Sequence, residues 1–340
     1  MQLKDFDYQL PPGIIAQTPL KKRDASRLLV LGRGDGSMEH SVFRRLPEHL
    51  RAGDCLIIND TRVMPARLYG KKETGAQAEV VLLKRLSADE WECIVRPGKR
   101  LRKGARVVFS QELSGEITGE LDGGNRVIRF FYEGEDFFSV LDRVGLVPLP
   151  PYITRKLSDS ERYQTVYARE QGSAAAPTAG LHFTPELLDT LRSRGIGIGS
   201  VTLHVGLGTF RPVKTRRITD HRMHSEVYAL PERTAELVRR TKENGGRVIA
   251  VGTTVCRTLE SVAREYGHVT AASGQTDLFL YPGCEFRIID GLITNFHLPQ
   301  STLLMLVCAF AGYENTMRAY RTAVEKKYRF FSFGDAMLVL

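Results

Sequence analysis

The stretch "DCLIINDTR" (54–62) decides the fold that the sequence predicts, because it joins a buried strand to a polar end. Residues 54–59 form a short apolar run, which is typical of a strand inside a sheet. The polar residues at its end are Asn59, Asp60, Thr61 and Arg62. After this strand the residue pattern changes to short β-rich runs, and later in the chain strands alternate with helices. The strand therefore predicts the start of a sheet that an insertion interrupts.

Residues from about 65 to 151 have the texture of a small β domain. Short β-rich runs follow one another closely and are separated by glycine-containing turns such as "LDGGN". The runs are "AEVVLLKRL", "EWECIVR", "ARVVFS", "GEITGEL" and "NRVIRFFY". The proline-rich "PLPPYI" (148–153) then closes the segment. We predict an inserted all-β barrel domain over residues 65–151.

After residue 151, strands alternate with helices, which is typical of a layered α/β domain. The expected helices "ELLDTLRSRG", "PERTAELVRRTKENGG" and "VCRTLESVAREYG" each end in glycine. The expected strands are "IGSVTLHV", "RVIAV" and "DGLITNF". The predicted fold class is α/β, a mixed-sheet layered α/β main domain (residues 1–64 and 152–340) with the barrel inserted.

The composition is that of a protein with two domains and no membrane span. The chain has 340 residues, and 42% of them are hydrophobic. No run of 18 or more apolar residues occurs and no secretory signal is visible, so we expect neither a membrane span nor a signal peptide. The five cysteines are an odd number and never form CxxC. We expect reduced thiols in a cytoplasmic protein, without disulfides or a structural zinc ion.

The net charge of +9 favours a polyanion as a partner. Basic residues gather in three stretches, at residues 21–27, 96–106 and 211–222. Such clusters are often no more than solvated faces. Three of them in one basic chain favour RNA, because neutralising phosphates releases counterions and drives binding.

Polar side chains follow several of the expected strands, where ligands of open α/β sheets usually bind. His182 lies two residues before a helix that begins at Thr184 and Pro185. The polar residues after the strands are His204, Thr209, Thr253, Thr254, Asn295, His297, Ser301 and Thr302. We predict that these groups converge on one cleft. The alternatives are structural histidines, threonines that cap helices, and an ion pair between Asp60 and Arg62.

Other site types lack their motifs. "GLG" (206–208) has no third glycine of GxGxxG, and no GK[ST] occurs, so neither a dinucleotide site nor a P-loop is predicted. "HRMHSE" (221–226) places two histidines near a glutamate but lacks HExxH, and we predict no metal site. G-x-S-x-G and a cysteine–histidine dyad are also missing.

Several blocks in order along the chain resemble the S-adenosylmethionine:tRNA ribosyltransferase-isomerase family of queuosine biosynthesis. They are "RDASRLLVL" (23–31), "NDTRVMPARL" (59–68), "PLPPYI", "RYQTVYA" (162–168), "AAPTAGLHFT" (175–184), "LHVGLGTFRPV" (203–213), "MHSE" (223–226), "VGTTVCRTLE" (251–260), "TDLFLYPG" (276–283), "TNFHLPQSTLLMLV" (294–307) and "YRFFSFGDAM" (328–337). Departures from the family pattern occur at Cys284, Cys308 and Phe333. We expect these to affect packing more than the cleft.

The resemblance implies an α/β domain with an inserted β-barrel, and an unusual reaction. S-adenosylmethionine would donate its ribosyl group to 7-aminomethyl-7-deazaguanine at the wobble position of tRNA. The resemblance implies that the transferred group would be rearranged to an epoxycyclopentanediol, giving epoxyqueuosine in tRNA and releasing adenine and methionine. S-adenosylmethionine is consumed as a substrate, so no cofactor is expected. We also expect a monomer.

Such a reaction needs proton transfers, for which imidazoles are suited near neutral pH. Our expected acid and base are His182 and His204, with His297 as a third candidate. Asp60 is expected to stabilise the sulfonium, and Arg62 or Thr253 and Thr254 the methionine carboxylate. Further expected substrate contacts are Thr178, Thr209 and Asn295. Expected tRNA contacts are Arg96, Lys99, Arg100, Arg102, Lys103, Lys214, Arg216 and Arg217.

Two other classes of function remain as alternatives. A non-catalytic RNA-binding protein would use the barrel and the basic loops, but it would have no need of histidines at a cleft. An S-adenosylmethionine-dependent tRNA methyltransferase would want a glycine-rich turn after its first strand and an acidic residue after its second, which the sequence does not offer convincingly. The reaction products distinguish the three: free adenine, methylated RNA, or neither.

Overall fold

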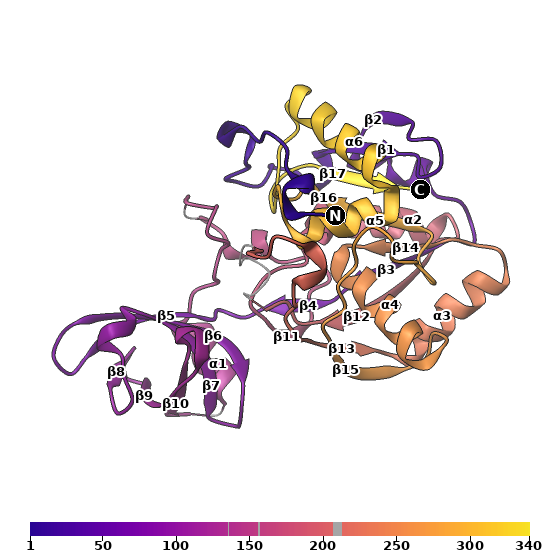
Figure 1. The fold of residues 1–340 in the computed structure, drawn as a ribbon. Coiled ribbons are helices and arrows are strands. Elements are labelled where there is room, and N and C mark those ends of the chain that lie inside the picture. Colours follow the sequence, from indigo (N-terminus) through magenta and orange to yellow (C-terminus); the bar gives the residue numbers. More distant parts are fainter. Residues whose placement is uncertain (135, 156, 207–212) are drawn as a thin grey trace. The chain divides into compact units, whose positions relative to one another are not determined.

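The computed structural model describes residues 1–134, 136–155, 157–206 and 213–340, which form two compact units (Figure 1). One unit consists of Met1–Arg62, Pro151–Glu170 and Ala176–Leu340, and the other of Val63–Pro150 and Gln171–Ala175. Residues 171–175 thus group with the barrel segment, whereas the sequence predicts them in the α/β domain. The reason is strand β11 (Glu170–Ser173), which pairs with β4 (Thr61–Val63) in a two-stranded sheet.

Within its described residues, the first unit contains a mixed sheet of nine strands in the order β15-β13-β12-β3-β14-β16-β17-β1-β2. In chain order these are β1 (Arg27–Leu31), β2 (Met38–Val42), β3 (Cys55–Asn59), β12 (Gly197–Leu203), β13 (Glu226–Leu230), β14 (Val248–Val251), β15 (Ala272–Thr276), β16 (Gly291–Asn295) and β17 (Ala336–Val339). The apolar run at 54–59 forms β3, which is buried along its whole length. The predicted mixed-sheet α/β fold is confirmed.

The strand directions bring functional segments to one edge of this sheet. Strands β12, β3, β14 and β16 are parallel neighbours, so their carboxyl ends meet there. Strand β17 runs antiparallel to β16 and parallel to β1, so β17 and β1 begin at the same edge. Residues just before these two strands, such as Ser26 and Asp335, therefore join the carboxyl-end residues. The sequence did not predict this contribution.

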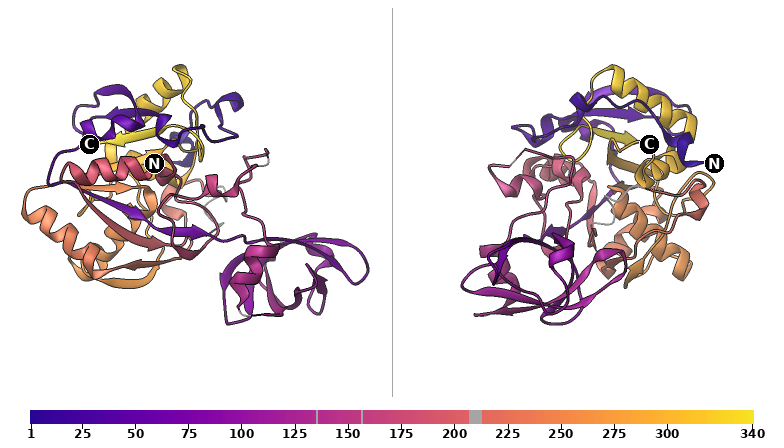
Figure 2. Two further views of the ribbon diagram at one scale, coloured as in Figure 1. Left: turned by 180° about the vertical axis from the view of Figure 1, so that it is seen from behind. Right: turned by 60° about the vertical axis from the view of Figure 1, so that its left-hand side comes forward.

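Helices lie on both sides of the sheet (Figure 2). They are α2 (Pro185–Ser193), α3 (Glu232–Glu243), α4 (Thr253–Tyr266), α5 (Thr302–Ala311) and α6 (Tyr313–Glu325). Helix α2 begins as predicted, since Thr184 Oγ1 accepts a hydrogen bond of 3.2 Å from Leu187 N. Its residues Leu187 and Leu191 pack with Leu56 and Ile58 of β3.

Helix α3 packs closely on the opposite face because β12 carries glycine there. A Cβ on Gly199 would lie 3.0 Å from Thr234 Cγ2 and 3.1 Å from Leu237 Cδ2. The neighbouring side chain on that face is Ile57, whereas Ile58 points to the α2 side. Glycine in β12 therefore sets the distance between α3 and the sheet.

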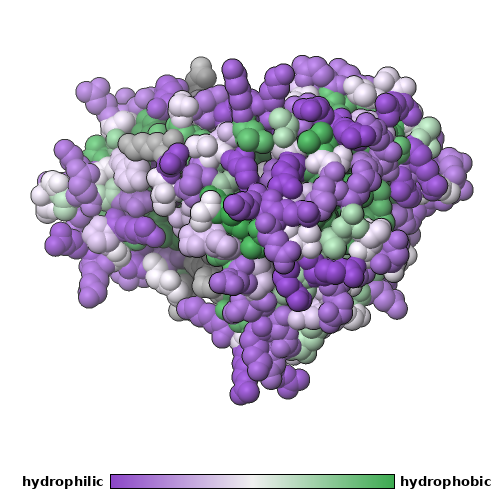
Figure 3. All heavy atoms as spheres, turned by 90° about the horizontal axis from the view of Figure 1, so that it is seen from above, coloured by the Kyte–Doolittle hydropathy of each residue, from purple (hydrophilic) through white to green (hydrophobic). Residues whose placement is uncertain are grey.

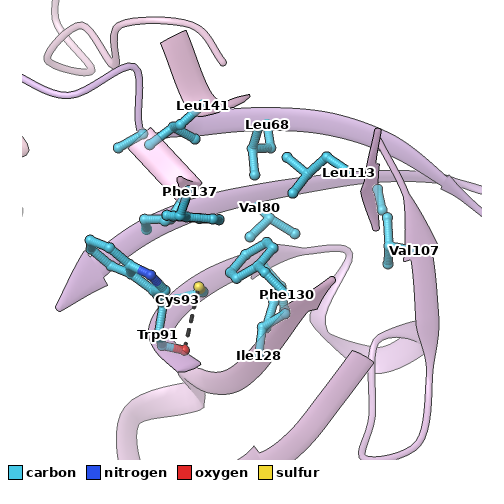
Figure 4. Close-up of a cluster of buried hydrophobic side chains, with 14 of the residues drawn as sticks. Leu68, Val80, Trp91, Cys93, Val107, Leu113, Ile128, Phe130, Phe137 and Leu141 are labelled. Atoms are coloured by element: carbon cyan, nitrogen blue, oxygen red, sulfur yellow. Dashed lines mark hydrogen bonds between the residues drawn. The ribbon is translucent and has the colours of Figure 1, made fainter. Parts of the chain in front are cut away.

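The second unit is a closed antiparallel barrel in its described part, with the order β10-β7-β6-β5-β8-β9. Its strands are β5 (Arg67–Lys72), β6 (Gln77–Arg85), β7 (Glu90–Arg96), β8 (Arg106–Val108), β9 (Leu113–Glu120) and β10 (Arg126–Tyr132). Helix α1 (Phe137–Val144) adds Phe137 and Leu141 to the apolar interior (Figure 4). The ring of Phe137 lies 5.6 Å from that of Trp91. The predicted barrel is confirmed.

The face shown in Figure 3 is mostly hydrophilic, with small apolar patches between hydrophilic residues. In the part of the chain that the structure describes, no helix has the length and apolar character needed to cross a membrane. All five cysteines lie in that part, and each is a free thiol.

Candidate active site

His204 follows β12 at the polar edge and is held by Thr61, which follows β3. The Nδ1 atom of His204 lies 2.7 Å from Thr61 Oγ1, and this hydroxyl donates to Glu170 O at 3.4 Å. In the tautomer with the proton on Nδ1, the Thr61 hydroxyl accepts from Nδ1 and donates to Glu170 O, and Nε2 keeps its lone pair. Among the described residues, Nε2 has no hydrogen-bond partner. Burial lowers the pKa of His204, although Glu170 and Asp60 oppose the shift. The arrangement suits a general base.

Asp60 is buried beside Thr61, but its carboxylate is already paired. It accepts hydrogen bonds from Thr202 Oγ1 at 2.7 Å and from the guanidinium of Arg169 at 2.5 Å. Arg62 instead pairs with Glu161 at 2.6 Å. The alternative of an Asp60–Arg62 ion pair is therefore wrong, because each residue has its own partner of opposite charge. Asp60 fixes Arg169 and β12 at the edge.

His182 lies at the end of the 3₁₀ helix Thr178–His182, enclosed by groups from three segments. Its Nδ1 is 2.7 Å from Ser26 Oγ, and its Nε2 is 3.2 Å from Asn295 Nδ2. The ring also stacks on Phe43, with 4.9 Å between centroids. Burial lowers the pKa of His182 to about 3, and Arg23 and Arg329 add to the shift. His182 is therefore neutral at physiological pH, with both nitrogens engaged, which suits positioning rather than proton transfer.

His297 is also enclosed. Its Nε2 lies 2.7 Å from Thr294 Oγ1, and its backbone N–H donates to the Tyr320 hydroxyl at 3.1 Å. Burial lowers the pKa of His297 to about 3. The structure thus places it among buried aromatic residues, and we do not retain it as an acid or base.

The first turn of α4 lies at the same edge, after a backbone position that requires glycine. Gly252 precedes the helix with φ of 95°, a conformation that other residues rarely adopt. Asn59 Nδ2 donates to Thr254 Oγ1 at 3.2 Å and to Leu203 O at 3.0 Å, which ties α4 to β3 and β12. Thr253 is buried. Thr178 is half-buried, and the predicted contact Thr209 lies outside the described residues.

Tyr167 connects the surroundings of His204 with those of His182, and sequence reasoning missed it. A Cβ on Gly180, in the 3₁₀ helix that ends at His182, would lie 2.1 Å from the Tyr167 hydroxyl. That hydroxyl is buried and has no hydrogen-bond partner within the described residues. Burial raises its pKa, and nearby Asp60 adds to this effect. Asp60 and Tyr167 also border a cleft of about 1060 Å³, its open mouth included.

A second, smaller cavity lies at His182, and the side chains around it were not predicted either. Arg23, Ser26 and Arg162 border it, together with Phe333. The blocks "RDASRLLVL" and "RYQTVYA" contain the three polar residues and were the available signal. The departure at Phe333 lies in this lining, and its buried ring also packs against Tyr163, with 5.8 Å between centroids.

The predicted tRNA contacts of the barrel are exposed on a loop that a buried arginine organises. Arg126 donates from Nε to Leu101 O at 2.8 Å and from Nη2 to Gly98 O at 3.2 Å. The exposed basic residues are Arg96, Lys99, Arg100, Arg102 and Lys103. Within the described ranges, none of their side chains forms an ion pair with a carboxylate. They remain candidates for phosphate contact.

The predicted contacts Lys214, Arg216 and Arg217 are exposed in the other unit, beside the amino-terminal segment. Leu3 N donates to Arg216 O at 3.0 Å there. In the nearby "HRMHSE" stretch, Glu226 forms a buried ion pair with Arg257. The described residues contain no cluster of metal-ligating side chains.

The fold and this edge define an α/β enzyme with an inserted β-barrel domain and a histidine-bearing site. The chain belongs to the queuosine biosynthesis protein family, whose sequence model matches residues 3–339. It is 57% identical to the S-adenosylmethionine:tRNA ribosyltransferase-isomerase of Acetivibrio thermocellus and 59% identical to that of Symbiobacterium thermophilum. Both comparisons cover 100% of each chain.

The structure is similar to the crystal structure of S-adenosylmethionine tRNA ribosyltransferase from Thermotoga maritima. The TM-score is 0.58 and the sequence identity 41%, over 99% of this chain and 100% of that one. The family assignment made from the sequence blocks is confirmed.

Proposed function

We propose that this chain transfers and isomerises the ribosyl moiety of S-adenosylmethionine onto 7-aminomethyl-7-deazaguanine at the wobble position of tRNA. The products are epoxyqueuosine in tRNA, adenine and methionine. The family match over residues 3–339 and the names of full-length relatives support this proposal. A methyltransferase or a non-catalytic RNA-binding protein is less well supported by these relatives.

The observation that carries the proposal is the bond between His204 and Thr61. A sulfonium acidifies the ribose carbon bonded to it, and removing that proton requires a base. His204 offers an Nε2 lone pair held in a fixed direction by the 2.7 Å contact of Nδ1 with Thr61. Its lowered pKa keeps the imidazole neutral, and therefore basic, at physiological pH.

The other residues of the edge have positioning roles in this proposal. His182 and Asn295 support the segment that contains Gly180, and Asp60 holds Arg169 against β12. S-adenosylmethionine is a substrate, and we propose no further cofactor. We propose that the enzyme acts as a monomer in the cytoplasm. Its five free thiols are typical of proteins from reducing compartments.

The test is to incubate the protein with S-adenosylmethionine and an anticodon stem-loop RNA that contains 7-aminomethyl-7-deazaguanine. Chromatography should detect free adenine and methionine in equal amounts, and mass spectrometry should detect the epoxycyclopentanediol on the RNA. Methylated RNA without adenine would identify a methyltransferase instead. RNA binding without any product would identify a binding protein.

A further inference from the structure

Arg23 and Arg162 both border the cavity at His182, and each donates a hydrogen bond to the chain segment next to the other. Arg23 donates to Glu161 O at 3.0 Å and to Leu181 O at 3.2 Å. Arg162 donates to Leu20 O at 2.6 Å and to Lys21 O at 3.2 Å. Every one of these acceptors is a backbone carbonyl, which orients a guanidinium without neutralising its charge. In the described part of the chain, neither arginine has a carboxylate within 4.0 Å.

Two arginines near His182 have a buried guanidinium N–H group without an acceptor in the described part of the chain: Arg162, which borders the cavity, and Arg329, which does not. Arg162 Nε is buried and has no partner among the described residues. The same holds for Nη1 of Arg329, whose other terminal nitrogen donates to Thr18 O. Leaving a buried donor unpaired costs free energy, more so when the donor is charged. Arg162 is therefore a cation at the cavity whose hydrogen bonds are incomplete within the described residues.

The region is also strongly electropositive. Burial lowers the pKa of Arg23, and neighbouring Arg162 adds to this, although Asp159 and Glu161 oppose it. Burial likewise lowers the pKa of Arg329, against the effect of Asp335. The Glu161 carboxylate is already paired with Arg62. The carboxylate of Asp335 accepts from backbone N–H groups of residues 27 and 329.

We propose that Arg23 and Arg162 bind an oxyanion of a substrate in the cavity beside His182, with Arg329 adding positive charge. The cavity is open to solvent, and Arg23, Arg162 and His182 border it. The identity of the substrates rests on the proposed function. Two groups share this chemistry: the methionine carboxylate of S-adenosylmethionine and a phosphodiester of the RNA. Arginine suits both, because its fork of donors matches two oxygens.

The neighbouring surface favours the phosphodiester. Arg23 and Arg162 also border a wider cleft of about 1150 Å³, open mouth included. Its other charged lining residues are the cations Lys21, Lys22 and Arg44, which outnumber the carboxylates Asp24 and Glu186. A nucleic-acid backbone carries a phosphate at every nucleotide and can occupy both places at once. A single methionine carboxylate would use only the inner one.

The test compares binding of both substrates to Arg23→Gln, Arg162→Gln and the control Arg45→Gln. Arg45 is exposed, pairs with Glu48 and does not border either cavity. Arg45→Gln therefore removes one positive charge, as the other two variants do, without changing either cavity. Calorimetry should show that one substrate binds about ten- to a hundredfold more weakly to Arg23→Gln and Arg162→Gln. If that substrate is the stem-loop RNA and its salt dependence flattens, the oxyanion is a phosphodiester. If the weakened substrate is S-adenosylmethionine, and its decarboxylated analogue binds wild type and variants equally well, the oxyanion is the methionine carboxylate.

The proposal is overturned if both substrates bind the two variants as tightly as they bind Arg45→Gln. Should Arg162→Gln fail to fold, Arg329→Gln and Arg162→Lys replace it. We expect Arg162→Lys to bind that substrate more weakly than wild type, because lysine keeps the positive charge but lacks the fork of donors. These measurements need no turnover. A wild-type protein that binds both substrates but releases no adenine would contradict the proposed function and leave the oxyanion site testable.

Discussion

Thr61 and His204 are separated by 143 positions in the sequence, yet Thr61 Oγ1 lies 2.7 Å from His204 Nδ1. Thr61 follows β3 and His204 follows β12, and these strands are parallel neighbours. The bond therefore forms because two carboxyl ends of strands meet at one edge. It orients the imidazole ring, and in the tautomer with the proton on Nδ1 it leaves Nε2 as the basic nitrogen.

His204→Gln should abolish most turnover while the fold is retained. Glutamine keeps a polar side chain but cannot remove a proton from carbon, and a positioned base contributes about a hundred- to ten-thousandfold. The measurement is the rate of adenine release. The control is His268→Gln, since His268 is exposed and bonds to the neighbouring Tyr266 O. Equal rates for both variants would exclude His204 as the base.

Deprotonation of the ribose carbon should slow as the pH falls through the pKa of His204. Burial lowers this pKa below its ordinary value of 6.5, so the slowing should begin below pH 6.5. Deuterium incorporation next to sulfur isolates the step if the RNA lacks the aminomethyl group. Thr61→Val should slow the exchange, because the imidazole loses its orientation, and Thr61→Ser should restore it. An exchange rate that does not depend on pH would contradict this role.

Much of the fold could be predicted from local sequence. The apolar run at 54–59, the glycine-ended helices and the β-rich texture of 65–151 depend on neighbouring residues alone. Pairings between distant segments could not be predicted in this way. Residues 171–175 group with the barrel because β11 pairs with β4, and the short run "EQGS" carries no hydrophobic pattern that would indicate this.

The location of the site at one edge of the sheet could be predicted from the sequence, but the role of each residue in it could not. Polar residues after strands indicated where the groups gather. Which histidine can transfer protons depends on enclosure: His182 has both ring nitrogens engaged, whereas His204 has one engaged in the described residues. Tyr167 and Arg23 could not be found in this way, because they follow no expected strand.

His182 and His297 should make the protein less stable in acid. Each has a pKa of about 3 in the folded protein and an ordinary value of 6.5 when exposed. Below pH 6.5 the unfolded chain binds protons that the folded protein excludes, so the free energy of unfolding falls as pH falls. Each histidine should contribute about 1.4 kcal/mol per pH unit between about pH 6 and pH 4. Urea unfolding at several pH values measures this slope.

The matched comparison for this slope is a variant with one histidine fewer. His297→Gln should flatten the pH dependence by the contribution of one group, whatever it does to stability at pH 7. The control is His268→Gln, which removes an exposed histidine that bonds to the neighbouring Tyr266 O. If His297→Gln and wild type have parallel curves, His297 is not held neutral by burial.

The basic loop of the barrel should contribute to RNA affinity by neutralising phosphates. Replacing Lys99, Arg100 and Arg102 with Gln should weaken RNA binding and reduce the salt slope by about 0.7 to 0.9 for each phosphate that is no longer neutralised. The control removes three exposed arginines that pair with carboxylates and border none of the clefts described above: Arg45, Arg129 and Arg143. Filter binding at several salt concentrations gives both slopes. An unchanged slope in the loop variant would mean that other residues bind the phosphates.

Gly180→Ala should disturb the site through Tyr167, and removal of the Tyr167 hydroxyl should relieve much of the disturbance. The added methyl group would lie 2.1 Å from that hydroxyl and 2.8 Å from Thr165 Cγ2. Such overpacking costs about 1–3 kcal/mol and would displace the segment that ends at His182. In Gly180→Ala/Tyr167→Phe the nearer of the two clashing atoms is gone, so stability should recover in part. Urea unfolding of the two single variants and the double variant measures the coupling. Additive losses would show that Gly180 and Tyr167 are not in contact.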